Sequence, residues 1–244
     1  MPAALHAIAG RLPARSAMRL RAAKNRKDLF GLYAPARLFS DLVPRGSVAV
    51  DAGAAHGLYT HFMAKRAAVV HAFEPNPHMY RRLDQGAGRK IIRHHMALSD
   101  RAGWATLHVP PAGFGEASLH EHPERGAELM QVDVETRTLD SFDLHGVGFL
   151  KVDVEGHELP LLRGALKTLR SQKPGVFIEL EERHAPGALD QARDLFGQLG
   201  YTSMHFLYRG AFQPIADFDL ERHQLGQVHA VSSPDYVCNF LFRA

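Results

Sequence analysis

The sequence predicts an α/β domain built on a mostly parallel sheet with helices on both faces. From Ser47 onward, short apolar runs alternate with helical segments, as in chains of β–α–β units. The runs of Val, Ile and Phe lack strict polar alternation, which is typical of strands buried on both faces. We therefore expect one domain over residues 47–244, preceded by a basic helical extension over residues 1–46.

The first half of this domain is predicted to contain three strands and two helices. Each strand is a short apolar run, and Pro77 marks the start of the second helix. The expected strands are 48–51, 69–73 and 91–96, and the expected helices are 58–66 and 76–83.

The second half begins with two runs on either side of a polar loop, 105–109 and 129–136, which predict an antiparallel pair. Because the segment before the final strand does not read as a helix, we expect an antiparallel hairpin at one sheet edge. The remaining predicted strands are 149–154, 176–180, 202–207 and 236–242, and the helices are 158–169 and 189–199.

Composition limits the class of protein. Cys238 is the only cysteine among the 244 residues, so an internal disulfide is excluded and a reducing compartment is favoured. No apolar run reaches the roughly 18 residues that a membrane-spanning helix needs. We expect a cytoplasmic protein without a membrane span, and the sequence leaves its oligomeric state open.

The basic residues are concentrated at the N-terminus. Seven of the 29 lie in residues 1–27, where there is no acid, so the remainder carries 22 basic against 26 acidic residues, a net charge of −4. This arm is open to three interpretations: an organelle-targeting peptide, a segment that touches anionic lipid or nucleic acid, or a helical extension. We favour the extension, interrupted at Pro13.

The turn after the first strand predicts a nucleoside site. Gly53 permits a tight turn, Gly57 permits close approach, and the following helix offers unpaired N–H groups. Glu74 ends the second strand, where a carboxylate can accept both hydroxyls of a ribose. The residues that we expect to bind this ligand are Asp51, Gly53, Ala54, His56, Gly57, Glu74, Pro75, Ser99 and Asp100.

The residues around the turn favour a ligand without phosphate. A dinucleotide turn reads G-x-G-x-x-G, and Ala55 stands where its second glycine belongs. Asp51 would repel a pyrophosphate and favour a cation. S-adenosylmethionine, which carries ribose, adenine, an ammonium and a sulfonium, fits these residues. Ser99 and Asp100 follow the third strand, where a side chain can accept from the adenine amino group.

A second group of charged residues lies in "FLKVDVEGHELPLLRGA". Lys151, Asp153 and Glu155 alternate with valines, which predicts that they share one face, with both acids at the carboxyl end of the strand. The proposed catalytic residues are Asp153, Glu155 and His157, one of which would take the proton of an attacking hydroxyl. The alternative is an ion pair with Lys151 and a helix-capping acid.

The stretches "VAVDAGAAHGLYT", "AFEPNP", "ALSD" and "LDSF…FLKVDVEGHELPLLRGA" resemble the FkbM family of S-adenosylmethionine-dependent methyltransferases, over residues 48–182. The resemblance implies a Rossmann-like class I methyltransferase sheet of seven strands, the last antiparallel. It also implies O-methylation of a sugar, polyketide or other small metabolite. The donor-binding residues would be Asp51, Gly53, Gly57, Glu74 and Asp100, while His56 stands where the family commonly has asparagine.

Other functions remain as alternatives. A nicotinamide-dependent oxidoreductase would use a similar sheet, and a non-catalytic nucleic-acid-binding module would use the basic arm.

Three further residues are candidates for the site. We expect Glu179 and His184 to face either the crevice or solvent, and Ser118 to lie where a lid over the acceptor is expected. A metal bound by His120 and His122 is not expected, because no third ligand stands at a familiar spacing.

Overall fold

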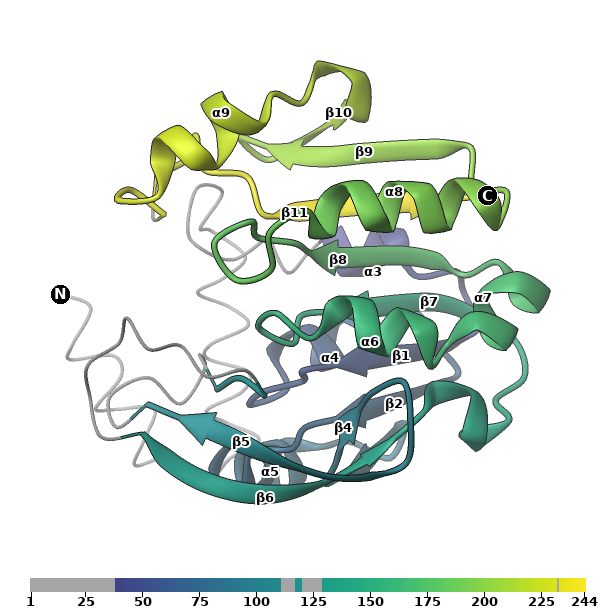
Figure 1. Ribbon diagram of the computed structural model, residues 1–244. Helices are drawn as coiled ribbons and strands as arrows, with labels where there is room; N and C mark the ends of the chain where they lie inside the picture. The colour runs from purple at the N-terminus through teal and green to yellow at the C-terminus, as the bar shows by residue number, and fades with distance from the viewer. Residues whose placement is uncertain (1–37, 111–116, 120–128, 232) are drawn as a thin grey trace, which may run out of the picture.

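The computed structural model describes residues 38–110, 117–119, 129–231 and 233–244 (Figure 1). Within these residues, eight strands form one sheet in the order β10-β9-β11-β8-β7-β1-β2-β3. This confirms the predicted α/β class, with one strand more than the predicted seven. The strands are β1 (Val48–Ala52), β2 (Val69–Phe73), β3 (Ile91–His94), β7 (Val147–Val152), β8 (Gly175–Glu179), β9 (Ser203–Tyr208), β10 (Ala211–Pro214) and β11 (Asn239–Arg243).

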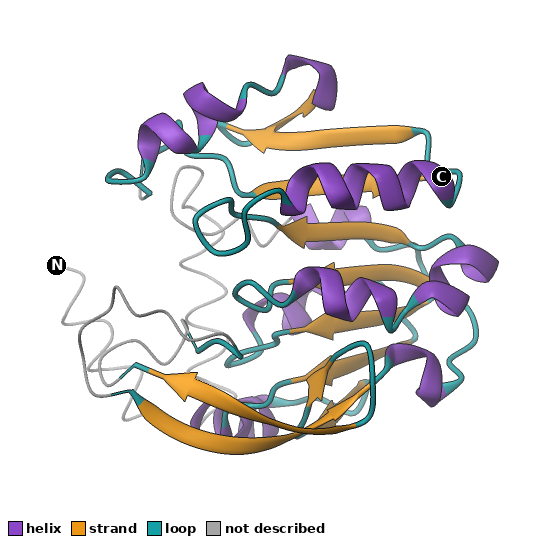
Figure 2. Ribbon diagram, viewed as in Figure 1, coloured by secondary structure: helices purple, strands orange, loops and turns teal. Residues whose placement is uncertain are grey.

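Helices cover both faces of this sheet (Figures 1 and 2). They are α3 (Leu38–Leu42), α4 (Leu58–Met63), α5 (Pro77–Gly86), α6 (Glu158–Arg163), α7 (Leu166–Gln172), α8 (Ala188–Gln198) and α9 (Leu220–His223). In Figure 1, α6 to α8 lie in front of the sheet, and α3 and α4 lie behind it. Leu162 and Phe196 belong to the front core, and Phe62 and Phe149 to the rear core. The strands are therefore buried on both faces, as their composition predicts.

Strands β3, β2, β1, β7 and β8 are parallel, and β11 runs antiparallel to both β8 and β9. The last two predicted strands thus pair antiparallel. The hairpin at the sheet edge, however, joins β9 to β10 through Arg209 and Gly210, with φ values of 48° and 81°. Two successive left-handed residues make a tight turn that matches the strand twist, which explains the additional strand.

A second, three-stranded sheet has the order β4-β6-β5. Its strands are β4 (Ala97–Leu98), β5 (Gly103–Val109) and β6 (Met130–Arg137), and β5 and β6 form the predicted antiparallel pair. The third predicted strand, 91–96, is shorter than expected. It ends at His94, because the chain leaves the large sheet there and pairs with β6 from Ala97.

The prediction of a single helix over 158–169 is wrong, because the helix breaks at Gly164 and Ala165 into α6 and α7. The carbonyl of Gly164 accepts a hydrogen bond from Asp140, N–O 3.0 Å. The carboxylate of Asp140 then accepts from the backbone N–H of Lys167 at 2.7 Å and of Thr168 at 2.9 Å. An acid distant in sequence therefore caps the second helix.

Most of the predicted N-terminal extension, residues 1–37, lies outside the described residues. Its last part, α3, packs on the rear face of the sheet. The fully buried ring of Phe39 lies 4.6 Å from that of Tyr59 and 5.0 Å from that of Phe177, between ring centroids. Among the helices that the structure describes, none has the length and apolar character needed to cross a bilayer.

Candidate active site

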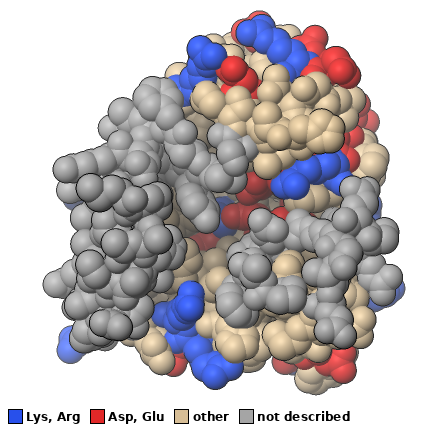
Figure 3. Space-filling view, turned by 90° about the vertical axis from the view of Figure 1, so that its left-hand side faces the viewer, with Lys and Arg blue, Asp and Glu red and all other residues tan. Residues whose placement is uncertain are grey.

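The strand order indicates which end of the sheet carries the candidate ligand site. Strand β1 lies between β2 and β7, so the loops that follow these three strands meet at one end of the sheet. The sheet extends in opposite directions from β1 and β7, which makes this pair the point where ligands bind in open parallel sheets. Figure 3 faces this end of the molecule and shows carboxylate surface recessed near the middle of the face.

The glycine turn packs directly against the loop after β7. Gly53 has φ 75°, and its N–H and that of Ala54 both donate to the carbonyl of Phe73, N–O 3.0 Å. A Cβ on Gly53 would lie 1.7 Å from the carbonyl oxygen of Asp153. Gly57, with φ 86°, begins α4. The glycines are thus needed for a close contact as well as for the predicted turn.

Glu74 is joined to the same turn. Its Oε2 accepts from the backbone N–H of Ala55 at 2.6 Å, and its Oε1 accepts from Asn76 at 2.8 Å. Burial raises the pKa of Glu74 to about 7. The two bonds occupy two of the roughly four acceptor positions of a carboxylate, which leaves capacity for two ribose hydroxyls. The neighbouring predicted donor residues, His56 and Pro75, are partly exposed.

Lys151 forms the ion pair that the alternative interpretation expects, and it bridges two of the predicted site acids. Its Nζ lies 3.4 Å from Oδ1 of Asp51 and 3.1 Å from Oδ2 of Asp153, and donates to the carbonyl of Gly53 at 3.2 Å. Burial raises the pKa of Asp51, whose other oxygen accepts from Thr60. Asp51 is fully buried, so its carboxylate contacts Lys151 and Thr60 in the interior instead of presenting charge at the surface.

The third predicted group contains Ser99, Asp100 and His157. The Oγ of Ser99 donates to Oδ1 of Asp100 at 3.2 Å and lies 2.9 Å from Nε2 of His157. The sequence grouped His157 with the acids at 153 and 155 as a candidate base. The structure instead places its ring against Ser99, the residue predicted to lie beside adenine.

Asp153 and Glu155 remain at the crevice, with side chains 27% and 21% exposed. Glu155 adopts a left-handed backbone, φ 52°, and its carbonyl accepts from Oγ of Ser118 at 2.6 Å. Ser118 therefore lies next to the loop that carries Glu155, and its place near an acceptor stays a prediction. His120 and His122 lie outside the described residues.

Sequence reasoning missed two acids, Glu158 and Glu181, and left Glu179 undecided. Glu158 accepts from the N–H of Gly156 at 3.0 Å, and its pKa is raised by burial to about 7. The pKa of Glu179 is raised well above its ordinary value, first by burial and then by Asp153. The alternation in "ELEE", which begins at the last residue of β8, was the available signal, because it puts both Glu179 and Glu181 on one face.

The site therefore combines the carboxylate of Glu74 and the N–H groups of the glycine turn with two partly exposed carboxylates, Asp153 and Glu155. The turn after β1 touches the loop after β7, because a Cβ on Gly53 would lie 1.7 Å from the carbonyl oxygen of Asp153. Ligands bound at the two sets of groups would therefore be adjacent.

A family model described as "Methyltransferase FkbM domain" matches residues 51–203. Among curated proteins, a hexuronic acid methyltransferase, AglP of Haloferax volcanii, is 28% identical over 148 residues. That match covers 59% of this chain and 61% of the relative, so the alignment spans about three fifths of the relative's length.

Among solved structures, the methyltransferase FkbM of Methylobacillus flagellatus KT is similar, with a TM-score of 0.53 and 17% identity. The match covers 84% of this chain and 47% of that one, so this chain spans about half of its length. At this identity the likeness concerns the fold, and it agrees with the Rossmann-like sheet expected from the sequence.

Proposed function

Because this chain belongs to the FkbM family of methyltransferases, we propose that it transfers a methyl group from S-adenosylmethionine to a hydroxyl of a sugar or another small metabolite. The observation that carries this proposal is the junction of Glu74, the glycine turn and Asp153 at one end of the sheet. Residues 47–244 form the proposed catalytic domain, and the basic extension before it has no assigned role.

The donor side is proposed to hold the ligand by its ribose and adenine. Glu74 accepts from the two ribose hydroxyls, in line with the two acceptor positions that its backbone contacts leave. Asp100, which accepts from Ser99, takes the adenine amino group. The N–H groups that begin α4 face the ligand over Gly57.

S-adenosylmethionine supplies a methyl group on a positively charged sulfur, which is a good leaving group. The protein then has to orient the acceptor hydroxyl and receive its proton. Asp153 and Glu155 are the carboxylates at the crevice, and burial, followed by the charge of Asp153, raises the pKa of Glu155 to about 8. A carboxylate at the crevice can act as a general base. We propose Asp153, whose side chain is partly exposed there, as the proton acceptor.

A relative that is named for a hexuronic acid supports a sugar as the acceptor class. We propose a sugar acceptor, because a crevice lined by carboxylates suits a ligand rich in hydroxyl groups. N-methylation and a non-sugar metabolite remain outcomes of the experiment. The earlier alternatives have less support. A nicotinamide ligand needs room for a pyrophosphate at Ala55, and a non-catalytic module bound through the basic arm would not need Glu74 joined to the glycine turn.

Two measurements test the proposal. Calorimetric titration of the full chain with S-adenosylhomocysteine, and separately with NADH, should show binding of the first alone. Incubation with S-adenosylmethionine and a panel of neutral and acidic hexoses, read by mass spectrometry, should show addition of one methyl group to a sugar. Binding of NADH without S-adenosylhomocysteine, or strong salt-dependent binding of RNA or DNA that residues 1–27 carry, would reject the proposal.

A further inference from the structure

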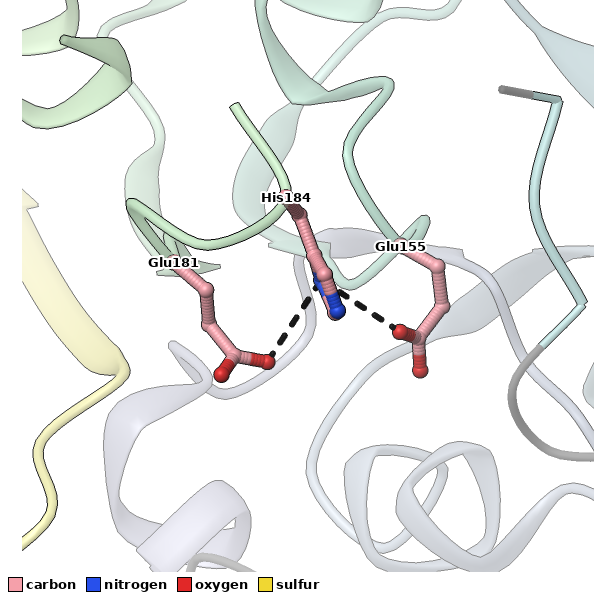
Figure 4. Close-up of side chains that lie close together, drawn as sticks. All are labelled: Glu155, Glu181 and His184. Atoms are coloured by element: carbon pink, nitrogen blue, oxygen red, sulfur yellow. Dashed lines mark ion pairs between the residues drawn. The ribbon is translucent and has the colours of Figure 1, made fainter. Parts of the chain in front are cut away.

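Three side chains with metal-ligand atoms converge from two loops next to the crevice. They are Glu155 from the loop after β7, and Glu181 and His184 from the loop after β8 (Figure 4). One ligand atom from each lies within 4.8 Å of the others. We propose that Glu155, Glu181 and His184 bind a divalent metal cation.

The spacing of the three groups fits a shared cation better than direct hydrogen bonds. Nδ1 of His184 lies 3.7 Å from Oε2 of Glu155 and 3.6 Å from Oε1 of Glu181. Both distances exceed the roughly 3.2 Å limit of a good N–H···O bond. Ligands about 2.1 Å from a metal in tetrahedral geometry are about 3.4 Å apart, close to the observed spacing.

Neighbouring groups hold one of these ligands in place. The carboxylate of Glu181 accepts from Nε of Arg183 at 2.6 Å and from Nη2 of Arg183 at 3.0 Å. It also accepts from the hydroxyl of Tyr236. Although burial opposes ionisation, these bonds keep the pKa of Glu181 below its ordinary value. Outer contacts of this kind orient the carboxylates of metal sites. The oxygen that faces His184 retains a lone pair for a cation.

The local charge balance also favours a cation. Glu155 is close enough to the carboxylates of Asp153, Glu181 and Glu158 to be repelled by them, and Arg183 offsets part of that repulsion. The nearby cation Lys151 is already shared by Asp51 and Asp153. A divalent ion between Glu155 and Glu181 would offset the repulsion among these acids.

The ligand set indicates the class of metal. Two carboxylates and one imidazole suit Mn²⁺ or Zn²⁺ better than Ca²⁺ or Cu⁺. Within the described parts of the chain, no other group of three His, Cys, Asp or Glu side chains has ligand atoms this close. Three protein ligands leave positions open for acceptor oxygens, an extension that rests on the proposed methyl transfer. The sequence did not predict the site, because its members come from two separate loops.

Metal binding is tested directly on the full chain after treatment with a chelator. Calorimetric titrations with Mn²⁺, Zn²⁺ and Mg²⁺, and the electron paramagnetic resonance spectrum of Mn²⁺, should show one bound ion, with Mn²⁺ or Zn²⁺ preferred to Mg²⁺. Glu155→Gln and His184→Ala should each weaken binding at least about tenfold. Asp190→Asn is the matched control for the first variant, because the side chain of Asp190 is 80% exposed on α8. His145→Ala is the control for the second, since His145 is 86% exposed.

Absence of binding by all three ions, or undiminished binding in both folded site variants, would overturn the metal site. Thermal melting shows that each variant is folded. S-adenosylhomocysteine is titrated into the same metal-free protein, so that the two proposals fail separately. If the unaltered chain binds S-adenosylhomocysteine but none of the three ions, the metal site alone is rejected. If it binds metal but not S-adenosylhomocysteine, the metal site is supported and the methyltransferase assignment is rejected.

Discussion

Glu74 accepts a hydrogen bond from the backbone N–H of Ala55 at 2.6 Å, which ties the end of β2 to the turn after β1. The contact gives the carboxylate a defined direction before any ligand arrives. Because this acceptor is already oriented, ligand binding loses less side-chain conformational entropy.

Glu74→Ala should weaken the binding of S-adenosylhomocysteine. The loss of a hydrogen bond to a charged group costs roughly 1.5–3 kcal/mol, which corresponds to about a 10- to 150-fold rise in Kd for each of the two bonds. Isothermal titration measures the change, with Asp190→Asn as the surface control. An unchanged Kd in a folded variant would disprove the ribose contact.

Donor affinity should depend on pH. Burial raises the pKa of Glu74 to about 7, so its carboxyl is mainly protonated below that pH and ionised above it. The ionised form accepts from both ribose hydroxyls, so the Kd for S-adenosylhomocysteine should fall as pH rises from about 6 to 8. In Glu74→Gln, which does not titrate, this part of the pH dependence should vanish. The same curve in both proteins would contradict the prediction.

Gly53→Ala should destabilise the fold more than Gly46→Ala. Both glycines have positive φ, 75° and 79°, so a new side chain strains both backbones by roughly 1–2 kcal/mol. At Gly53 the added Cβ would also meet the carbonyl of Asp153 at 1.7 Å, whereas nothing lies within 4 Å at Gly46. Overpacking adds roughly 1–3 kcal/mol at position 53. Chemical denaturation compares the two, and equal losses would exclude the close contact.

Lys151→Met should lower the free energy of unfolding by about 3–5 kcal/mol, because it leaves buried carboxylates without their counter-charge. The double variant Lys151→Met/Asp51→Asn should recover part of that loss. Burial raises the pKa of Asp51, so without Lys151 the folded state binds this proton more strongly than the unfolded state. The unfolding free energy of Lys151→Met should therefore decrease as pH rises. A pH-independent loss would show that Asp51 is not the affected group.

Asp153→Asn and His157→Ala should affect different steps. Asp153 lies at the crevice, so its variant should lower kcat more than it weakens donor binding. His157 contacts Ser99 at 2.9 Å, so its variant should mainly weaken donor binding and leave kcat at saturating donor less changed. Steady-state kinetics with titration of S-adenosylhomocysteine separates the two effects. The reverse pattern would restore His157 as the candidate base.

Local sequence signals predicted the elements that depend on local chemistry. Strand β2 has the predicted bounds, and the side chain of Asn76 caps α5 one residue before Pro77. The hairpin at Arg209 and Gly210 and the break at Gly164 were missed. The first depends on φ values that an arginine seldom adopts, and the second on a cap from Asp140 that is distant in sequence.

The order of residues along the chain sufficed to establish the sheet class, the glycine turn and the acid after the second strand. These features depend on periodicity and on bonds between near neighbours. The meeting of Glu155 with Glu181 and His184, and the contact of His157 with Ser99, required the folded chain. Parallel strands β7 and β8 bring their loops together only when helices pack on both faces, and no local pattern encodes that packing.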